Sequence, residues 1–219
     1  MALSPKKLER FKREIKKGRK TYAQENKLEW LKALLDSYHY SDVGTRIELE
    51  SQFKTNNKIL ACGEGCSNCC QNTQVPINEI ELMGLSWYVS EEMDSETFQR
   101  ITPQLINHLE TTACPFLLDG RCSVYEVRPI ACRVFNVFGK KCEEREDISF
   151  SRPEDIAHTH DVDIAWMVSQ KLMPFMGVTD KKQQRYLFED GFMMRKTRAL
   201  HTFDWNVFKE QVDQIKSTL

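Results

Sequence analysis

The sequence has no long hydrophobic run. Nowhere do about 18 apolar residues occur together, the number that a membrane-spanning helix needs, although 41% of the 219 residues are hydrophobic. The basic amino-terminal residues are also not followed by an apolar segment of signal-peptide length. We therefore expect a soluble, cytoplasmic protein that makes no contact with a membrane.

The motifs of common enzyme classes are missing as well. The chain has no phosphate-binding glycine loop, no dinucleotide fingerprint and no recognisable pair of nucleophile and base. These absences leave the catalytic residues unknown and leave open whether the protein is an enzyme. Internal repeats, low-complexity linkers and alternating strands and helices are absent too, so nothing indicates a repeat protein or a parallel sheet.

Helical periodicity dominates the first half of the chain. Residues 5–36 are predicted to form one long helix or two helices broken near Gly18, and residues 41–54 a further helix. Asn78, followed three residues later by Glu81, is typical of a capping box that opens a helix. The core-facing side of this helix is expected to carry its large apolar residues: Ile80, Met83, Leu85, Trp87 and Tyr88.

Further helices are predicted in the second half, limited by proline and glycine. One begins near Ser95 and is expected to be divided by Pro103, which lacks a backbone donor. Another is capped by Asp161 and ends at the turn of residues 174–177, and the last spans about residues 204–216.

The best strand signal is a pair of short apolar segments separated by Asp-Gly at 119–120, which predicts a tight β-hairpin. In a two-residue hairpin Cys122 would lie opposite Leu117. Pro129 then suits the first turn of a short helix that carries Cys132.

Eight cysteines dominate the middle of the chain. Four lie within nine residues, from Cys62 to Cys70, and the small residues among them let the backbone fold back so that several sulfurs face one centre. Thiols stay reduced in the cytoplasm, and the adjacent Cys69 and Cys70 are too close for ordinary disulfide geometry. The pattern therefore predicts metal ligands. The candidate ligands are all eight cysteines: Cys62, Cys66, Cys69, Cys70, Cys114, Cys122, Cys132 and Cys142.

The predicted fold is mainly α: an irregular, cysteine-rich metal-binding core with one short β-hairpin, flanked by helices. We divide the chain into an N-terminal helical segment (residues 1–58), the cysteine-cluster core (59–145) and C-terminal helices that pack on the core (146–219). A chain of this length is expected to form one compact domain overall.

The order and spacing of the cysteine motifs are specific. After C-x3-C-x2-C-C come C-P-F-L from Cys114, D-G, C-S-V-Y-E-V-R-P from Cys122 and C-R-V-F from Cys132. This pattern resembles the YkgJ-like cysteine-cluster family, which is described as a zinc- or iron-chelating CxxCxxCC domain. The same pattern occurs in flagellin lysine N-methylases, where it implies an iron–sulfur cluster. The resemblance spans about residues 62–135, and many members have two residues rather than three between the first two cysteines.

Thiolate ligands alone do not choose the metal. Four cysteines suit a closed zinc site or one iron–sulfur cluster. Structural zinc sites usually show two C-x2-C pairs, and the second half of this pattern has none, so a 4Fe–4S cluster is preferred to Zn²⁺. Eight thiols allow two four-cysteine sites or one site with spare thiols. Cys142, outside the resemblance and beside Lys140 and Lys141, is either the eighth ligand or an exposed thiol with a lowered pKa. In the one-site case, Cys142→Ser is expected to keep full metal occupancy.

Three classes of function are compatible with this pattern. The first is a metal-binding protein organised by an iron–sulfur or zinc centre. The second is an enzyme that uses the centre, in a redox reaction or in protein-lysine N-methylation, as the resemblance implies. The third is an interaction module in which zinc is only structural. The C-x3-C-x2-C spacing also resembles the loop of radical S-adenosylmethionine enzymes, but those alternate strands and helices and place an aromatic residue where this chain has Asn68.

Several residues near the cysteines have two interpretations each. Arg128 and Arg133 can stabilise thiolates or an anionic cluster as fixed cations, or form ordinary ion pairs. Tyr125 and Phe135 are expected to seal the hairpin against water rather than to take part in chemistry.

Two histidines, His158 and His160, lie close to Asp161 and Asp163. Together these four residues can ligate a second metal. Their position just before a helix instead favours capping and solvation.

The amino-terminal end carries the one basic patch of the sequence. Between Lys6 and Lys20 lie nine Lys or Arg residues and only two Glu residues, although the whole chain has a net charge of −1. Leu8, Phe11 and Ile15 recur there at helical spacing. A solvated amphipathic helix is preferred to a nucleic-acid contact, because no aromatic interleaving or nucleic-acid motif accompanies the charge. The sequence specifies no partner, and a protein partner is compatible with it.

Overall fold

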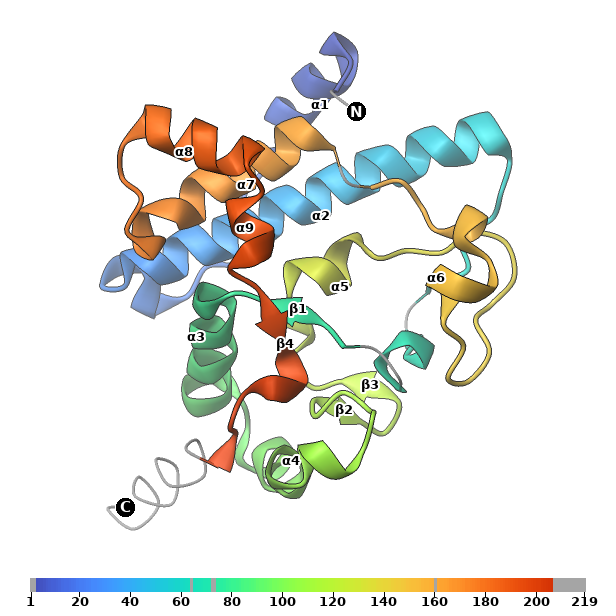
Figure 1. Cartoon of the computed structure of the whole chain (residues 1–219), viewed down its shortest axis with the longest axis vertical. Helices are drawn as coiled ribbons and strands as arrows, with labels where there is room; N and C mark the ends of the chain where they lie inside the picture. Colours follow the sequence, from blue (N-terminus) through green and yellow to red (C-terminus); the bar gives the residue numbers. More distant parts are fainter. Residues whose placement is uncertain (1–2, 64, 72–73, 160, 207–219) are drawn as a thin grey trace.

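The computed structural model describes residues 3–63, 65–71, 74–159 and 161–206. Its longest helix, α2 (Glu29–Asn56), crosses the whole molecule in Figure 1. Shorter helices contact α2 along its length: α1 (Pro5–Ile15), α3 (Glu79–Trp87), α5 (Ile130–Val134) and α7 (Val162–Leu172). The mainly α fold class predicted from the sequence is confirmed.

Of the two alternatives expected for residues 5–36, the structure shows two helices with a break near Gly18. Helix α1 ends at Ile15, and Gly18 adopts a left-handed φ of 81°, which ends the helical path before α2. The separate helix predicted over residues 41–54 is wrong, because α2 continues through them. The hydroxyls of Ser37 and Ser41 donate to carbonyls one turn earlier, so these polar side chains find partners inside the helix.

Two glycines let neighbouring helices approach α2 closely. A Cβ atom at Gly44 would lie 2.3 Å from Cδ1 of Ile164 in α7. One at Gly84 in α3 would lie 2.3 Å from Cδ2 of Leu34. These contacts hold α7 and α3 on different sides of α2 (Figure 1).

The hydrophobic core surrounds α2 and is filled from all parts of the chain. Its largest fully buried side chains include Phe11, Leu31, Ile77, Leu85, Ile101, Phe116, Leu172 and Leu200. Within the described ranges, no helix combines the length and the apolar character needed to cross a bilayer.

Helix α3 begins with the predicted capping box. Asn78 accepts a hydrogen bond from the backbone N–H of Glu81, and Glu81 accepts one from the backbone N–H of Asn78. Ile80 is buried as expected, but Met83 is 42% exposed, so its predicted place in the core is wrong. The reason is that the neighbouring Gly84 faces α2.

The predicted hairpin is confirmed. Strand β2 (Leu117–Leu118) pairs with β3 (Arg121–Cys122), and Leu117 lies opposite Cys122, as a two-residue turn requires. Both residues of the turn at 119–120 have positive φ angles, which an Asp-Gly turn of this type needs.

A second strand pair joins the carboxyl-terminal part to the core and was not predicted. Strand β1 (Pro76–Ile77) pairs with β4 (Arg198–Ala199), and Leu200 N donates to the carbonyl of Val75 (2.8 Å). Figure 1 shows the two strands side by side below α2. Two-residue strands have no periodicity that a sequence pattern can reveal.

Helix boundaries in the second half follow local signals. Asp161 caps α7 through its side chain, and Gly177 ends the following turn with a φ of 81°. Pro103 does not divide α4 (Ser95–Ile106) as predicted, because it lies in the last turn, where its missing donor costs one hydrogen bond. The helix predicted over residues 204–216 lies almost entirely outside the described residues. The remaining α-helices of the described part are α6 (Ile148–Ser151), α8 (Lys181–Glu189) and α9 (Phe192–Arg195).

Candidate metal centre

The cysteine loop (residues 62–70) turns back on itself through its own backbone. Cys66 N donates to the carbonyl of Gly63 (3.1 Å), and Cys70 N donates to the carbonyl of Ser67 (2.9 Å). Gly65 suits this turn because its φ of 76° lies in the left-handed region, which glycine adopts without strain.

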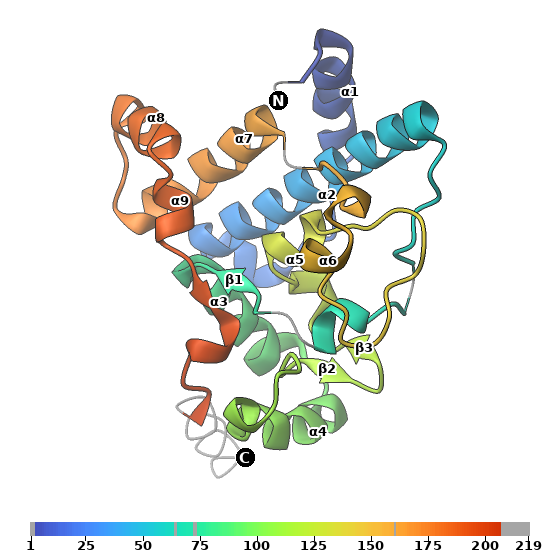
Figure 2. The ribbon, with the colours of Figure 1, turned by 45° about the vertical axis from the view of Figure 1, so that its right-hand side comes forward.

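The loop ends in a short 3-10 helix, η2 (Asn68–Gln71), which carries Cys69 and Cys70. Figure 2 shows η2 in turquoise near the β2–β3 hairpin. The Cys70 thiol donates to the sulfur of Cys69, which lowers the pKa of Cys69 to about 7 and raises the pKa of Cys70. Cys69 is therefore the more easily deprotonated thiol of the pair, which favours it as a metal ligand.

Backbone hydrogen bonds tie the hairpin to η2. Cys114 N donates to the carbonyl of Cys70 (2.7 Å), and Leu117 N donates to the carbonyl of Cys114 (3.0 Å) where the hairpin begins. Burial raises the pKa of Cys114 to about 12, and the thiols of Cys122 and Cys69 add to the increase. Backbone contacts thus hold η2, the segment of Cys114 and the hairpin together.

Cys132 reaches this group from α5. Burial raises its pKa well above the ordinary value, with further increases from the thiols of Cys114 and Cys122. Glu81 of α3 positions this helix, because its Oε1 accepts a hydrogen bond from Ile130 N (2.7 Å) at the start of α5. In the sequence, Glu81 is marked only by its position in the capping box. Its hydrogen bond to the start of α5 was not predicted.

The segment after α5 returns to the cysteine loop. Val137 N donates to Sγ of Cys62 (3.3 Å), and the side-chain amide of Asn68 donates to the carbonyl of Cys142. Burial raises the pKa of Cys62 to about 11, and the thiols of Cys66 and Cys142 raise it further. These contacts place Cys142 beside the first part of the loop.

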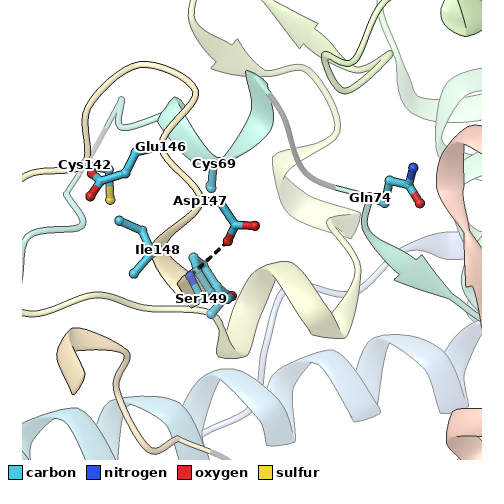
Figure 3. A pocket seen from close by; sticks show the side chains of 8 residues that line it. Cys69, Gln74, Cys142, Glu146, Asp147, Ile148 and Ser149 are labelled. Carbon is cyan, nitrogen blue, oxygen red and sulfur yellow. Dashed lines mark hydrogen bonds between the residues drawn. The ribbon is translucent and has the colours of Figure 1, made fainter. Parts of the chain in front are cut away.

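A pocket of about 200 Å³ lies between the loop and this segment. Its lining includes Cys69, Cys142, Phe135, Glu146 and Asp147. In Figure 3, Cys69 projects from η2, while Cys142 and the two carboxylates come from the chain after α5. Thiols from two segments are therefore accessible to a small molecule or ion.

The donor set fits zinc or iron by its chemistry. In the part of the chain that the structure describes, no three His, Cys, Asp or Glu side chains are grouped closely enough to hold a metal ion. The donors are nevertheless thiols, which as thiolates are soft ligands that both zinc and iron–sulfur clusters take. They also come from segments that hydrogen bonds already hold together.

A protein-family model described as "CxxCxxCC: Putative zinc- or iron-chelating domain" matches residues 61–157. We refer to residues 61–157 as the CxxCxxCC domain, after the model that they match. The match confirms the resemblance seen in the sequence, identifies a metal-binding domain for zinc or iron, and extends past α5 to include Cys142. No curated protein and no solved structure matches the chain.

Two arginines of the CxxCxxCC domain lie near its thiols. Arg133 is buried and donates to the Asp42 carboxylate (2.5 Å) and to the carbonyl of Glu126 (2.6 Å). Arg128 lies 3.7 Å from the same carboxylate. Burial raises the pKa of Cys122, and both guanidinium groups oppose this increase. These arginines therefore form ion pairs with Asp42 and also lower the pKa of the Cys122 thiol.

The aromatic residues of the CxxCxxCC domain behave differently from the prediction. Tyr125 does not seal the hairpin, because it is 62% exposed and its ring lies 3.9 Å from the Arg128 guanidinium. Phe135 is half-buried and lines the pocket instead.

Cys142 is not an exposed thiol with a lowered pKa. The residue is half-buried, and burial raises its pKa, while the Arg152 guanidinium opposes the increase. Lys140 pairs with Glu143 rather than with the thiol. Its role as the eighth ligand stays a prediction.

The histidine cluster lies at the edge of the CxxCxxCC domain and contacts backbone groups. His158 is held through its own backbone by the side chain of Gln52 (2.8 and 3.1 Å). Asp161 caps α7, and Asp163 accepts a hydrogen bond from the backbone near the amino terminus. These contacts favour the capping interpretation, and His160 lies outside the described residues.

Proposed function

We propose that the CxxCxxCC domain holds an iron–sulfur cluster of the 4Fe–4S type through cysteine thiolates. The alternative is a zinc ion bound by the same cysteines. The proposed ligands come from the eight cysteines: Cys62, Cys66, Cys69, Cys70, Cys114, Cys122, Cys132 and Cys142.

The central position of Cys69 carries this proposal. Burial raises the pKa of most of the other cysteines, and the Cys69 thiol adds to the increase at six of them: Cys62, Cys70, Cys114, Cys122, Cys132 and Cys142. Thiols that affect one another in this way lie within electrostatic reach of one sulfur. The proposal is therefore supported by cysteines from four separate segments that lie within electrostatic reach of Cys69.

The spacing of the ligands favours iron–sulfur over zinc, because the second half of the pattern has no C-x2-C pair. When bound, such a cluster supplies one-electron redox chemistry. The arginines near Cys122 support an anionic centre, since fixed cations lower the cost of burying its charge.

We also propose that the helical segment 1–58, the core 59–145 and the helices 146–219 form one domain. Supporting this, residues from all three segments share one hydrophobic core, for example Phe11 and Leu172. A cytoplasmic location fits the proposal, because reducing conditions keep the thiols available for metal.

Metal analysis of anaerobically purified protein tests the proposed cofactor. An iron–sulfur protein should be brown, should contain iron and acid-labile sulfide, and should bleach when a reductant is added. If the purified protein is colourless and contains zinc, the centre is a zinc site and not an iron–sulfur cluster. Protein that contains neither metal, and takes up neither after anaerobic reconstitution, would refute metal binding itself.

An enzyme that uses the centre is the second candidate function. The pocket favours it, because it exposes Cys69 and Cys142 to a small molecule. Transfer of a labelled methyl group from S-adenosylmethionine to lysine peptides by reconstituted protein would support methylation. If the peptides stay unlabelled while the cofactor is intact, the protein does not methylate lysine.

A further inference from the structure

The segment before the cysteine loop and the segment after α5 are paired through their backbones. Ala61 N donates to the carbonyl of Val137 (2.8 Å), and Gly139 N donates to the carbonyl of Ile59 (2.7 Å). The pairing is antiparallel, as in a β-ladder. Residues 62–135 therefore form a loop that backbone hydrogen bonds close at its two ends.

A third segment pairs with the other edge of residues 136–139. Phe138 N donates to the carbonyl of Asp155 (2.8 Å), and Ala157 N donates to the carbonyl of Asn136 (2.8 Å). Residues 136–139 thus have backbone partners on both edges. Figure 1 shows the chain that follows α2 and the chain around α6 on the same side of the molecule. We call the three paired segments the clamp: residues 58–61, 136–139 and 155–157.

The clamp buries apolar side chains of its own. Val137 is fully buried, and Phe138 and Ala157 are only 4% and 5% exposed. In the described part of the chain, none of these three residues belongs to the core that surrounds α2. Burial of apolar surface favours folding without any ligand. The clamp therefore has a source of stability that needs no metal.

Ion pairs connect the outer segments of the clamp. Lys58 of the first segment pairs with Asp155 of the third (2.9 Å), and Asp155 also pairs with Arg152 (3.0 Å). Arg152 in turn pairs with Glu146 (2.9 Å). The side chains of Arg152, Glu146 and Asp155 are mostly shielded from water, so salt screens these pairs less than fully exposed ones. The network holds the third segment against the first.

None of these contacts uses a cysteine. They can therefore form before any metal is bound. A loop whose ends are already joined loses less conformational entropy when it becomes ordered than a chain with free ends. Its thiols also stay at a high effective concentration with respect to one another.

We propose that the clamp folds without metal and keeps residues 62–135 closed at both ends, so that this region loses and regains metal while the rest of the chain stays folded. The clamp and the core around α2 then form a metal-independent frame for the cysteine loop. The folding of the clamp stands on its own contacts, whereas the return of metal to the loop rests on the proposed function.

Hydrogen exchange of the full chain, with zinc(II) as the metal and after chelator treatment, tests the clamp. Four backbone amides report on it: Ala61, Phe138, Gly139 and Ala157. In metal-free protein these amides should exchange at least about tenfold more slowly than those of residues 62–70, because separately stable units open independently. Equal exchange rates at the clamp and at residues 62–70 in metal-free protein would overturn the proposal.

Phe138→Ala removes a buried side chain of the clamp. In metal-free protein it should speed exchange of the other clamp amides at least about tenfold and leave α2 protected. It should also weaken zinc(II) binding, measured by competition with a chelator, at least about tenfold, because the loop is no longer closed. Phe53→Ala, at a 49% exposed position of α2, is the matched control and should change neither quantity.

Two results with Phe138→Ala would count against the clamp. Loss of protection in α2 would show that the clamp is no separate unit, and unchanged zinc(II) affinity with an opened clamp would show that closure does not assist metal binding. If the unmodified chain takes up no metal, the proposed function fails. Slow exchange at the clamp amides would still support a clamp that folds alone, so the two failures are distinguishable.

Discussion

Glu81 is a buried carboxyl group that joins two helices beside the thiols. Only 2% of the residue is exposed, and its side chain accepts hydrogen bonds from the backbone of Asn78 (3.1 Å) and of Ile130 (2.7 Å). Burial raises the pKa of Glu81 to about 7, although these hydrogen bonds lower it. The start of α3 and the start of α5 are thus held by one titratable group.

Stability should therefore depend on pH through Glu81. The carboxyl has a higher pKa in the folded chain (about 7) than its ordinary value of 4.5. Its contribution is fully present below pH 4.5 and is lost as pH rises through 7, because the folded chain binds the proton more tightly. At about 1.4 kcal/mol per pKa unit, the stability lost between these two values is about 3.5 kcal/mol.

Glu81→Gln cannot ionise and can still take part in the capping box. We expect its stability relative to the original chain to increase between pH 5 and pH 7, measured by urea unfolding at both values. The control is Glu79→Gln, at an exposed position two residues earlier. It should have the same small effect on stability at pH 5 and at pH 7. The same stability difference at pH 5 and pH 7 for Glu81→Gln would contradict this role.

The β2–β3 hairpin is the element that sets the position of Cys122. Its turn needs positive φ angles at Asp119 (50°) and Gly120 (72°). Glycine adopts such a conformation without strain, whereas a residue with a Cβ pays about 1–2 kcal/mol. The register of the strands, and with it the direction of the sulfur, depends on this turn.

Gly120→Ala should lower the unfolding free energy by about 1 kcal/mol and reduce metal content, because the strained turn shifts Cys122. Thermal unfolding and metal analysis measure the two effects. Gly63→Ala, in the cysteine loop, is the matched control, since a Cβ at Gly63 meets no atom within 4 Å and its φ is not in the left-handed region. If both variants hold the same amount of metal, the turn does not control the ligand.

At the scale of the whole molecule, α1 is packed onto α2 and is more than a solvated helix. Phe11 is fully buried, and its ring makes an edge contact with Tyr40 at 5.7 Å. Much of the basic charge is paired, as in the contacts of Lys7 with Glu48 (2.8 Å) and of Arg10 with a further glutamate of α2. Partly exposed ion pairs stabilise little, so the buried ring is the main attachment.

Phe11→Ala should destabilise the whole chain by about 3–5 kcal/mol, because it removes a fully buried aromatic side chain. Arg10→Ala, which breaks an ion pair on the same helix, should cost less than about 1 kcal/mol. Urea unfolding of both variants measures the difference. Comparable losses would mean that charge pairing, rather than packing, attaches α1.

Removal of metal should affect the molecule unevenly. The region from about Cys62 to Phe135 is expected to need the metal for its order, because the cysteine loop has little apolar content of its own. The outer helices α2 and α7 are expected to persist in part, because they pack directly on each other. Chelator treatment followed by limited proteolysis should yield cleavage at sites such as Arg100 and Arg121 before cleavage within α2. Metal-loaded protein is the control, and identical cleavage with and without metal would refute the coupling.

The sequence by itself determined the features that depend on neighbouring residues. The hairpin with Leu117 opposite Cys122 and the capping box at Asn78 each follow from contacts within a few positions. The cysteine spacing likewise indicated the family whose model matches residues 61–157, because the order of the cysteines is written directly in the chain. These features could be predicted since their physical cause is local.

The tertiary structure alone decided which distant segments meet. It made α2 continuous through residues 41–54, left Tyr125 in solvent and paired β1 with β4. It also brought the chain carrying Cys142 back to the cysteine loop. Such contacts depend on the packing of a shared core, and no periodicity or spacing within a single segment records which other segment will cover it.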